Sequence, residues 1–289
     1  MISGITYVSG FFDIERVTDA YLQNPENYYG WINQLFLYDI HLYFFTTEDI
    51  YKRLVFTPRP NLHFKILEHP PYYEKYEETK ENWKKYQTGN PNKDTYQFGC
   101  LTNGKFLLLE EAIKLNPFNH THYSWIDAGI TKIVLQPELI LDIKLPSKIK
   151  LLLLNYINPE EIKQKEFVLT CRYKIAGGFF IGPKDLMLSF SKWIQELIKD
   201  GIHGLEQEYM AIIYRIHNDV FDPYFGDFCD LIRNIETTTN MSWLIKRNLD
   251  QAFDNKDSSE VHRIISYLLK SPISLSDKIY VEEKYHLLQ

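Results

Sequence analysis

The chain has 289 residues, a formal net charge of −6 and 45% hydrophobic residues, which is enough apolar material for a large buried core. Its positive and negative residues are interspersed, so it lacks the basic face that neutralises phosphates in nucleic-acid complexes. The longest apolar runs, such as IKLLLLNYI at 149–157, are far shorter than a bilayer span. These properties predict a globular protein with no nucleic-acid partner and no stable membrane insertion.

The N-terminus and the cysteines bear on the cellular compartment. The segment MISGITYVSGFFDIERV has no basic residues ahead of its apolar stretch, which favours a first core strand over a signal peptide. Cys100, Cys171 and Cys229 are widely spaced and form no C-x-x-C pair, which argues against a disulfide framework and a thiolate zinc site. We therefore expect a cytoplasmic protein whose cysteines are buried free thiols.

The first third of the chain alternates β-prone runs with a segment of helical spacing. Strands are expected at 5–12, 40–47 and 61–68, and a helix within 16–38, because the runs are rich in β-branched and aromatic residues. Such alternation is typical of a parallel sheet with crossover helices. The charged, proline-flanked segment 70–97 is expected to hold one exposed helix followed by a loop.

The middle of the chain is predicted to contain amphipathic helices around two strands. One helix, within 104–118, ends at Asn116-Pro117, because helices seldom continue past the residue before a proline. Strands are expected at 122–127 and from Glu166 onward. The apolar spacing predicts three core faces: Phe106, Leu109 and Ile113; Leu186, Phe190, Trp193 and Leu197; and Leu205, Tyr209, Ile212 and Ile216.

The pattern changes near residue 236. The segments 236–253 and 258–271 are predicted to be helices, each opened by Ser or Thr caps. We therefore expect one domain in residues 1–235 and a C-terminal helical appendix in residues 236–289. The appendix is expected either to pack on the main domain or to make a homo-oligomer contact.

Asp127 is the first candidate functional residue. Tyr123 and Trp125 favour a strand and Ala128-Gly129 ends it, which would place Asp127 at the carboxyl edge of a sheet, where α/β proteins bind ligands. Gly129 would let a bulky ligand approach the acid. Mn²⁺ or Mg²⁺ takes oxygen ligands, and one or two protein carboxylates suffice beside a diphosphate. The alternative is that Asp127 is a turn or helix-capping residue.

Three further features carry candidate residues. The segment AGGFFIG at 176–182 is either a β-bulge or turn, or a floor on which a sugar ring rests against bare backbone. Glu206 and Glu208 open a helix, where acids complement the helix dipole or accept a proton from an attacking hydroxyl. His120-Thr121-His122 is the only H-x-H motif, which leaves a histidine-dependent metallohydrolase as a third hypothesis.

Several common catalytic motifs are absent. The sequence contains no G-x-S-x-G, no P-loop, no G-x-G-x-x-G and no H-E-x-x-H. The chain therefore lacks the motifs that are typical of four enzyme classes. These are acyl hydrolases, P-loop nucleotidases, dinucleotide oxidoreductases and zinc metalloproteases.

Taken in order, a set of segments resembles the HtrL/YibB proteins, a group of bacterial and viral sequences related to nucleotide-sugar glycosyltransferases. The segments are ITYVSGFFDIER, LYFFTTED, GKFLLLEEAIKLNPF, YSWIDAGI, IAGGFFIG, LEQEYM and FDPYFGDF. The similarity runs from about residue 5 to about residue 234 and omits the helical tail. It implies a GT-A fold, a Rossmann-like α/β domain in which a nucleotide-sugar lies across the carboxyl ends of a mostly parallel central sheet.

The resemblance also implies roles for residues of the donor site. In the loop after the first strand, the family's nucleoside-binding positions match Ser9, Phe11, Asp13 and Arg16. Lys105 matches a lysine that pairs with the base region or the diphosphate. Trp125, Phe11 and Phe12 either stack on the base or the sugar, or belong to the core.

The metal, sugar and acceptor positions follow in the same way. Asp127 matches the first acid of the D-x-D metal motif, whereas Gly129 stands in place of the second acid, so the usual two-carboxylate arrangement is incomplete. Gly177 and Gly178 match the floor beneath the donor sugar. Glu206 and Gln207 match a pair that faces the acceptor.

The leading hypothesis is a metal-assisted glycosyltransferase that moves a hexose or N-acetylhexosamine from a UDP-sugar to a glycan, protein or lipid-linked acceptor in glycan assembly. Asp127 would bind Mn²⁺ or Mg²⁺, and Glu206, or else Glu208 or Asp227, would deprotonate the acceptor hydroxyl. The alternative is a non-catalytic nucleotide-sugar or glycan-binding protein on the same fold, which the missing second acid favours. The stereochemical course and the oligomeric state are left open.

Overall fold

The computed structural model describes residues 4–14, 25–85 and 94–287, and these form a 7-stranded sheet in the order β3-β2-β1-β4-β6-β5-β7. The strands are β1 (Ile5–Gly10), β2 (His41–Thr47), β3 (Leu62–Leu67), β4 (His122–Ile126), β5 (Lys150–Leu153), β6 (Ile175–Pro183) and β7 (Tyr224–Phe225). Strand β1 pairs in parallel with β2 and β4, and β2 with β3. The predicted α/β class with a mostly parallel central sheet is confirmed.

Strand β6 is the exception to the parallel order. It runs antiparallel to both β4 and β5, and β5 pairs in parallel with β7. All but the last of its residues are buried, and every residue of β5 is buried. Strands that are buried on both faces are continuous apolar runs without alternation. The segment IKLLLLNYI therefore contains a strand, which its sequence pattern did not predict.

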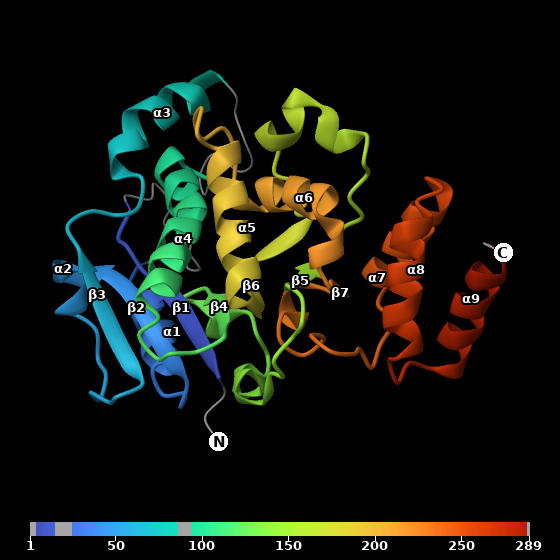
Figure 1. Ribbon diagram of the computed structural model, residues 1–289, viewed down its shortest axis with the longest axis horizontal. Coiled ribbons are helices and arrows are strands. Elements are labelled where there is room, and N and C mark those ends of the chain that lie inside the picture. Colours follow the sequence, from blue (N-terminus) through green and yellow to red (C-terminus); the bar gives the residue numbers. More distant parts are fainter. Residues whose placement is uncertain (1–3, 15–24, 86–93, 288–289) are drawn as a thin grey trace.

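The helices cover the sheet and extend from one end of it. They are α1 (Pro25–Leu35), α2 (Glu48–Tyr51), α3 (Tyr76–Lys85), α4 (Tyr96–Leu115), α5 (Lys184–Leu197), α6 (Glu206–Ile216), α7 (Trp243–Asp254), α8 (Ser258–Leu269) and α9 (Leu275–His286). Helices α4 and α5 pack side by side across one face of the sheet (Figure 1). No described helix is both long and apolar enough to cross a bilayer.

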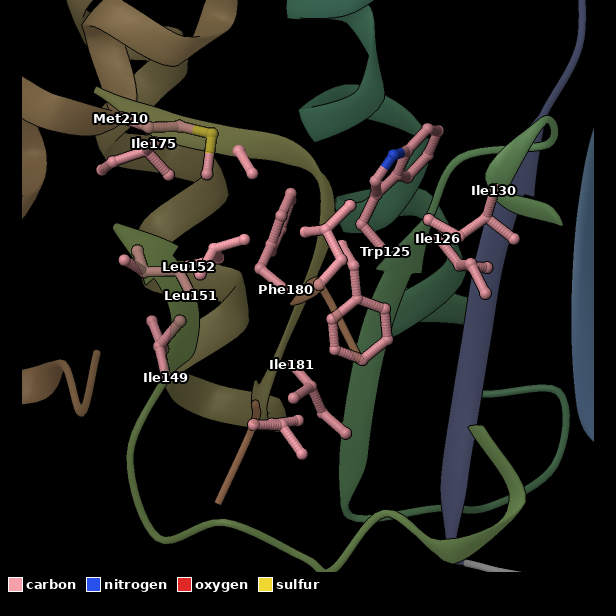
Figure 2. Close-up of a cluster of buried hydrophobic side chains, with 14 of the residues drawn as sticks. Trp125, Ile126, Ile130, Ile149, Leu151, Leu152, Ile175, Phe180, Ile181 and Met210 are labelled. Atoms are coloured by element: carbon pink, nitrogen blue, oxygen red, sulfur yellow. The ribbon is translucent and has the colours of Figure 1, made fainter. Parts of the chain in front are cut away.

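The centre of the core lies where β4, β5 and β6 meet. Trp125 is opposite Phe180 in the register of β4 and β6, and Leu151 is opposite Phe180 in that of β5 and β6. Figure 2 shows Phe180 and Ile181 between the side chains of β4 and those of β5. The core therefore fixes β4, and with it Asp127, by aromatic packing.

Three predictions for the middle of the chain were wrong, one for a strand and two for the core face of a helix. The segment from Glu166 forms a 3₁₀ helix (Lys165–Leu169), and the glycine pair lies inside the single strand β6. The core side of α5 is Met187, Phe190, Ser191 and Ile194, whereas Leu197 is exposed.

The shifted face of α5 has a local cause. Apolar residues lie on both of its sides, and Ser191 can face the core because its hydroxyl donates to Met187 O at 3.0 Å. Trp193 instead stacks on the His217 ring at 3.8 Å between centroids. The predicted α6 face was also wrong at Ile216, which is exposed.

The helical appendix packs on the main domain through buried polar contacts. Tyr214 of α6 donates to Glu260 of α8 at 2.9 Å, and Arg215 pairs with Asp257 at 2.9 Å. Asn248 of α7 accepts from the backbone of Tyr156 at 2.6 Å. A third appendix helix, α9, was not predicted, and its N-cap is Ser274. The domain boundary at residue 235 and a homo-oligomer contact stay predictions.

Histidines gather at the amino ends of the parallel strands, away from the edge that carries Asp127. The rings of His41 and His120 lie 4.5 Å apart, and His41 also contacts Phe118 at 4.9 Å. Burial lowers the pKa of His41, and the neighbouring His120 lowers it further. Burial likewise lowers the pKa of His120. His122 lies apart from this pair and contacts Pro146 O.

We expect acidification to unfold the protein through these two histidines. Their pKa values in the folded state lie below the ordinary value of about 6.5, so the unfolded state takes up protons first. Their stabilising contribution is complete above about pH 6.5 and declines as the pH falls through the folded-state pKa values. Urea unfolding at pH 7.5 and pH 5.5 should show a smaller loss of stability for His41→Gln/His120→Gln than for the wild type. The exposed His69→Gln variant is the control, and equal losses in all three proteins would contradict the assignment.

Candidate active site

Asp127 lies directly after β4 at the carboxyl edge of the sheet, as predicted. Its backbone N donates to Gly178 O at 2.8 Å, and its Oδ1 accepts from Trp125 Nε1 at 2.7 Å. The following 3₁₀ turn (Ile130–Lys132) has Gly129 as its N-cap and no side-chain cap. The carboxylate of Asp127 therefore does not cap this turn, and it faces the pocket described below.

Lys105 joins the acids of the site. It reaches in from α4, is 3% exposed, and donates to Gly177 O and Glu206 Oε1, each at 2.9 Å. Its Nζ also lies 3.5 Å from Asp127 Oδ1. Burial alone would lower the pKa of Lys105, but the charges of Asp127 and Glu206 outweigh burial and raise it. An ammonium group has three N–H donors, and each has a protein partner here.

Glu206 is the first residue of α6 and the second acid of this cluster. It is 4% exposed, and its place at the helix N-terminus favours its negative charge. A Cβ at Gly177 would lie 2.1 Å from Glu206 Oε1, and a Cβ at Gly178 would lie 3.3 Å from Asp127 Oδ2. The glycine pair therefore admits the two carboxylates against β6, and its role as a floor for the donor sugar stays a prediction.

A pocket of about 500 Å³ opens over this cluster, within the ~300–1,000 Å³ typical of ligand sites. The predicted site residues that line it are Phe11, Phe12, Asp13, Lys105, Trp125, Asp127, Gly129, Gly177, Gly178, Glu206 and Gln207. Trp125 belongs to the core in Figure 2 and also lines the pocket, and its stacking on the base or the sugar stays a prediction.

Three predicted residues, Ser9, Asp227 and Glu208, are not among the lining residues of the pocket. Ser9 is fully buried within β1, because the strand continues through Gly10 before the chain reaches the pocket. Asp227 accepts a hydrogen bond from Phe228 N in a capping box. Arg16 lies outside the described residues. The structure therefore corrects the placement of Ser9 in a nucleoside site.

A steric constraint explains why the third position of the incomplete D-x-D motif is a glycine. A Cβ at Gly129 would lie 2.9 Å from Tyr28 Cε1, so a second acid here would displace that ring. Tyr28 stacks on Phe11 with centroids 5.4 Å apart, and Lys132 Nζ contacts its hydroxyl at 2.6 Å. Sequence reasoning missed Tyr28 and Lys132, which reach the pocket from α1 and from the turn after Asp127.

The acidic residues of the site can supply one protein ligand to a divalent cation that also binds a diphosphate. Oδ1 of Asp127 contacts Trp125 and Lys105, while the side chain is 47% exposed and lines the pocket. The described part of the chain holds no group of three or more His, Cys, Asp and Glu side chains that could bind a metal ion. A site of this kind would depend on phosphate oxygens and water for its remaining ligands.

Glu208 takes a different position from Glu206, although only one residue separates them. It is completely buried, its Oε1 accepts from Arg172 N at 2.8 Å, and its Oε2 has no hydrogen-bond partner among the residues that the structure describes. Burial raises the pKa of Glu208 to about 8, so the group is largely protonated near neutral pH. Glu206 is therefore the better candidate for a base in the pocket.

The fold and site define an α/β protein with a ligand pocket at the carboxyl edge of a mostly parallel sheet. The chain belongs to the HtrL_YibB family, described as bacterial proteins of unknown function, whose family model matches residues 3–237. No curated protein matches it. A solved structure that it resembles is the apo form of mouse xyloside xylosyltransferase 1, at 13% identity and a TM-score of 0.37, covering 86% of this chain and 92% of that one.

Gly177→Ala tests the packing of the cluster. The new methyl group would meet Glu206 Oε1 at 2.1 Å and force the Lys105–Glu206 pair apart. We expect a loss of about 1–3 kcal/mol in the free energy of unfolding, measured by urea denaturation. Gly30→Ala in α1 is the matched control, because a Cβ there meets nothing within 4 Å. A Gly177→Ala protein as stable as the control would contradict this packing.

Glu208→Gln should stabilise the protein, and more so at high pH. Between about pH 4.5 and pH 8 the folded wild type keeps a proton that the unfolded chain has released, so its stability falls as the pH rises through this window. Glutamine cannot ionise. We expect the free energy of unfolding of Glu208→Gln, relative to that of the wild type, to grow by on the order of 1–3 kcal/mol between pH 5 and pH 8. Exposed Glu282→Gln in α9 is the control, and a pH-independent difference for Glu208→Gln would refute the raised pKa.

Proposed function

We propose that the protein is a glycosyltransferase that transfers a hexose or N-acetylhexosamine from a UDP-sugar to an acceptor hydroxyl. The observation that carries the proposal is the cluster of Asp127, Lys105 and Glu206 at the carboxyl edge of β4, inside a pocket of about 500 Å³. Such edges bind nucleotide ligands in α/β folds. The chain belongs to the HtrL_YibB family, which is described as of unknown function, and the link to nucleotide-sugar enzymes is the resemblance stated in the sequence analysis.

The donor would bind on the side of the pocket formed by Phe11, Tyr28, Asp127 and Lys132. The stacked rings of Phe11 and Tyr28 offer an apolar surface for the base. Lys132 is an exposed cation close to them, suited to a diphosphate oxygen. Asp127 would hold Mn²⁺ or Mg²⁺ through Oδ2, and that ion would supply positive charge against the leaving diphosphate.

The acceptor hydroxyl would lose its proton to Glu206 as its oxygen attacks the anomeric carbon and the bond from that carbon to the diphosphate oxygen breaks. Lys105 holds Glu206 Oε1 at 2.9 Å and so fixes the direction of the carboxylate. Because its donors already have protein partners, we assign Lys105 to positioning the two acids. A contact between Lys105 and the diphosphate would require it to give up one of these bonds.

The proposal extends to the surroundings of the reaction. The acceptor belongs to a glycan, a protein or a lipid-linked sugar, and the reaction takes place in the cytoplasm during glycan assembly. Use of Mn²⁺ or Mg²⁺ is part of the same proposal, supported by the 47% exposed carboxylate of Asp127 in the pocket.

Thermal shift and donor hydrolysis test the proposal directly. A ligand that binds only the folded state raises its apparent stability, by about 2.7 kcal/mol at one hundred times Kd. We expect a UDP-sugar with Mn²⁺ or Mg²⁺ to raise the melting temperature more than GDP-, dTDP- or CMP-sugars or any donor with EDTA. Asp127→Asn should weaken binding at least about tenfold, whereas Asp254→Asn, exposed on α7, should not.

The same measurements separate the alternative function. A non-catalytic nucleotide-sugar or glycan-binding protein is favoured by the single acid of the incomplete D-x-D motif, whose third position packs against Tyr28. It predicts saturable binding without hydrolysis or transfer under any metal. If no nucleotide-sugar raises the melting temperature of the wild type, the glycosyltransferase and the nucleotide-sugar-binding alternative are both refuted, and glycan binding alone is left.

A further inference from the structure

Two aromatic side chains form the wall of the pocket beside Glu206. Tyr173 and Phe228 both line it, with ring centroids 6.3 Å apart and an interplanar angle of 84°. Tyr173 is 40% exposed, although it is a large ring in a molecule whose aromatic residues are mostly buried. Neither ring belongs to the donor side that Phe11, Tyr28 and Lys132 form.

Tyr173 is held in an unfavourable backbone conformation. Its φ of 48° lies in the left-handed region, which bulky residues seldom occupy and which persists only where the surroundings fix it. Three hydrogen bonds fix it here: Arg172 N donates to Glu208 Oε1 at 2.8 Å, Asn155 Nδ2 donates to Tyr173 O at 2.7 Å, and Leu154 N donates to Lys174 O at 2.9 Å. The surrounding hydrogen bonds thus hold Tyr173, whose ring lines the pocket, in a strained backbone conformation.

The charge distribution of the pocket separates this wall from the donor side. Tyr173 and Phe228 line the pocket together with uncharged residues and with the ion cluster of Lys105, Asp127 and Glu206, whose charges pair with one another. The uncharged lining residues include Phe98, Leu101, Thr102, Leu205, Gln207 and Leu231. The donor side, in contrast, carries Asp13 and Lys132. A ligand on this wall is therefore neutral, with an apolar face for the rings and at least one hydroxyl for Glu206.

We propose that Tyr173 and Phe228 form the acceptor platform and that the acceptor is a neutral sugar. The C–H face of a pyranose ring packs on one of the two aromatic rings, its edge meets the other ring, which stands at 84° to the first, and one of its hydroxyls faces Glu206. Glu208 is a positioning residue for this platform, because it bonds the backbone next to Tyr173 from the same turn of α6 that carries Glu206. The inference rests on the proposed function and names its acceptor class.

The test compares transfer with donor hydrolysis in the same protein. Wild type, Tyr173→Ala, Phe228→Ala and Tyr173→Phe are given a UDP-sugar with Mn²⁺ and a panel of methyl hexopyranosides and N-acetylhexosaminides. We expect the ratio of transfer to hydrolysis to fall about tenfold in the two alanine variants, mainly through the KM for the acceptor, and Tyr173→Phe to keep it. Tyr73→Ala is the matched control, because Tyr73 is 49% exposed, stacks on His69 and lies outside the pocket.

A second comparison separates the platform from a structural role. Tyr173→Gly removes the ring and the strain together, so it should melt at a higher temperature than Tyr173→Ala while transferring no better. Alanine variants that transfer sugar as well as the wild type would overturn the inference. So would a wild type that hydrolyses a UDP-sugar but neither binds nor glycosylates any neutral sugar of the panel. A wild type that binds no nucleotide-sugar at all refutes instead the proposed function beneath it.

Discussion

The positive charge of Lys105 inside the protein is the constraint on which the site depends. A buried ammonium is stable only with opposite charges and hydrogen-bond acceptors around it, and Lys105 has Asp127, Glu206 and Gly177 O. These partners come from β4, α6 and β6, while the lysine comes from α4. One ion cluster thereby ties four elements that are distant in sequence, and it draws both acids to the same edge of the sheet.

The glycines of the site are a steric consequence of that cluster. The carboxylate of Glu206 occupies the space of a side chain at position 177, and Asp127 lies near the corresponding space at 178. At position 129 the space belongs to the Tyr28 ring instead. Each glycine therefore admits a group of the protein itself. The glycine pair of β6 and the glycine in place of the second acid thus have a common steric explanation.

Local patterns in the sequence predicted the parallel strands, the edge position of Asp127 and the acid at the start of α6, because each depends on a few neighbouring residues. They did not predict the direction of β6, since a buried apolar run looks the same in either direction. The predicted core face of α5 was wrong because apolar residues lie on both sides of this helix. Tyr28, Lys132 and Tyr173 escaped notice because only the folded chain brings them to Asp127 or Glu206.

Helix α6 has a part in two places that are far apart. Its first residue is Glu206 in the pocket, and near its other end Tyr214 and Arg215 bond Glu260 and Asp257 of the appendix. An 11-residue helix is a stiff rod about 16 Å long. Helix α6 thus connects the appendix rigidly to the carboxylate that faces the reacting hydroxyl. A partner that bound α8 and shifted it would displace Glu206 without entering the pocket.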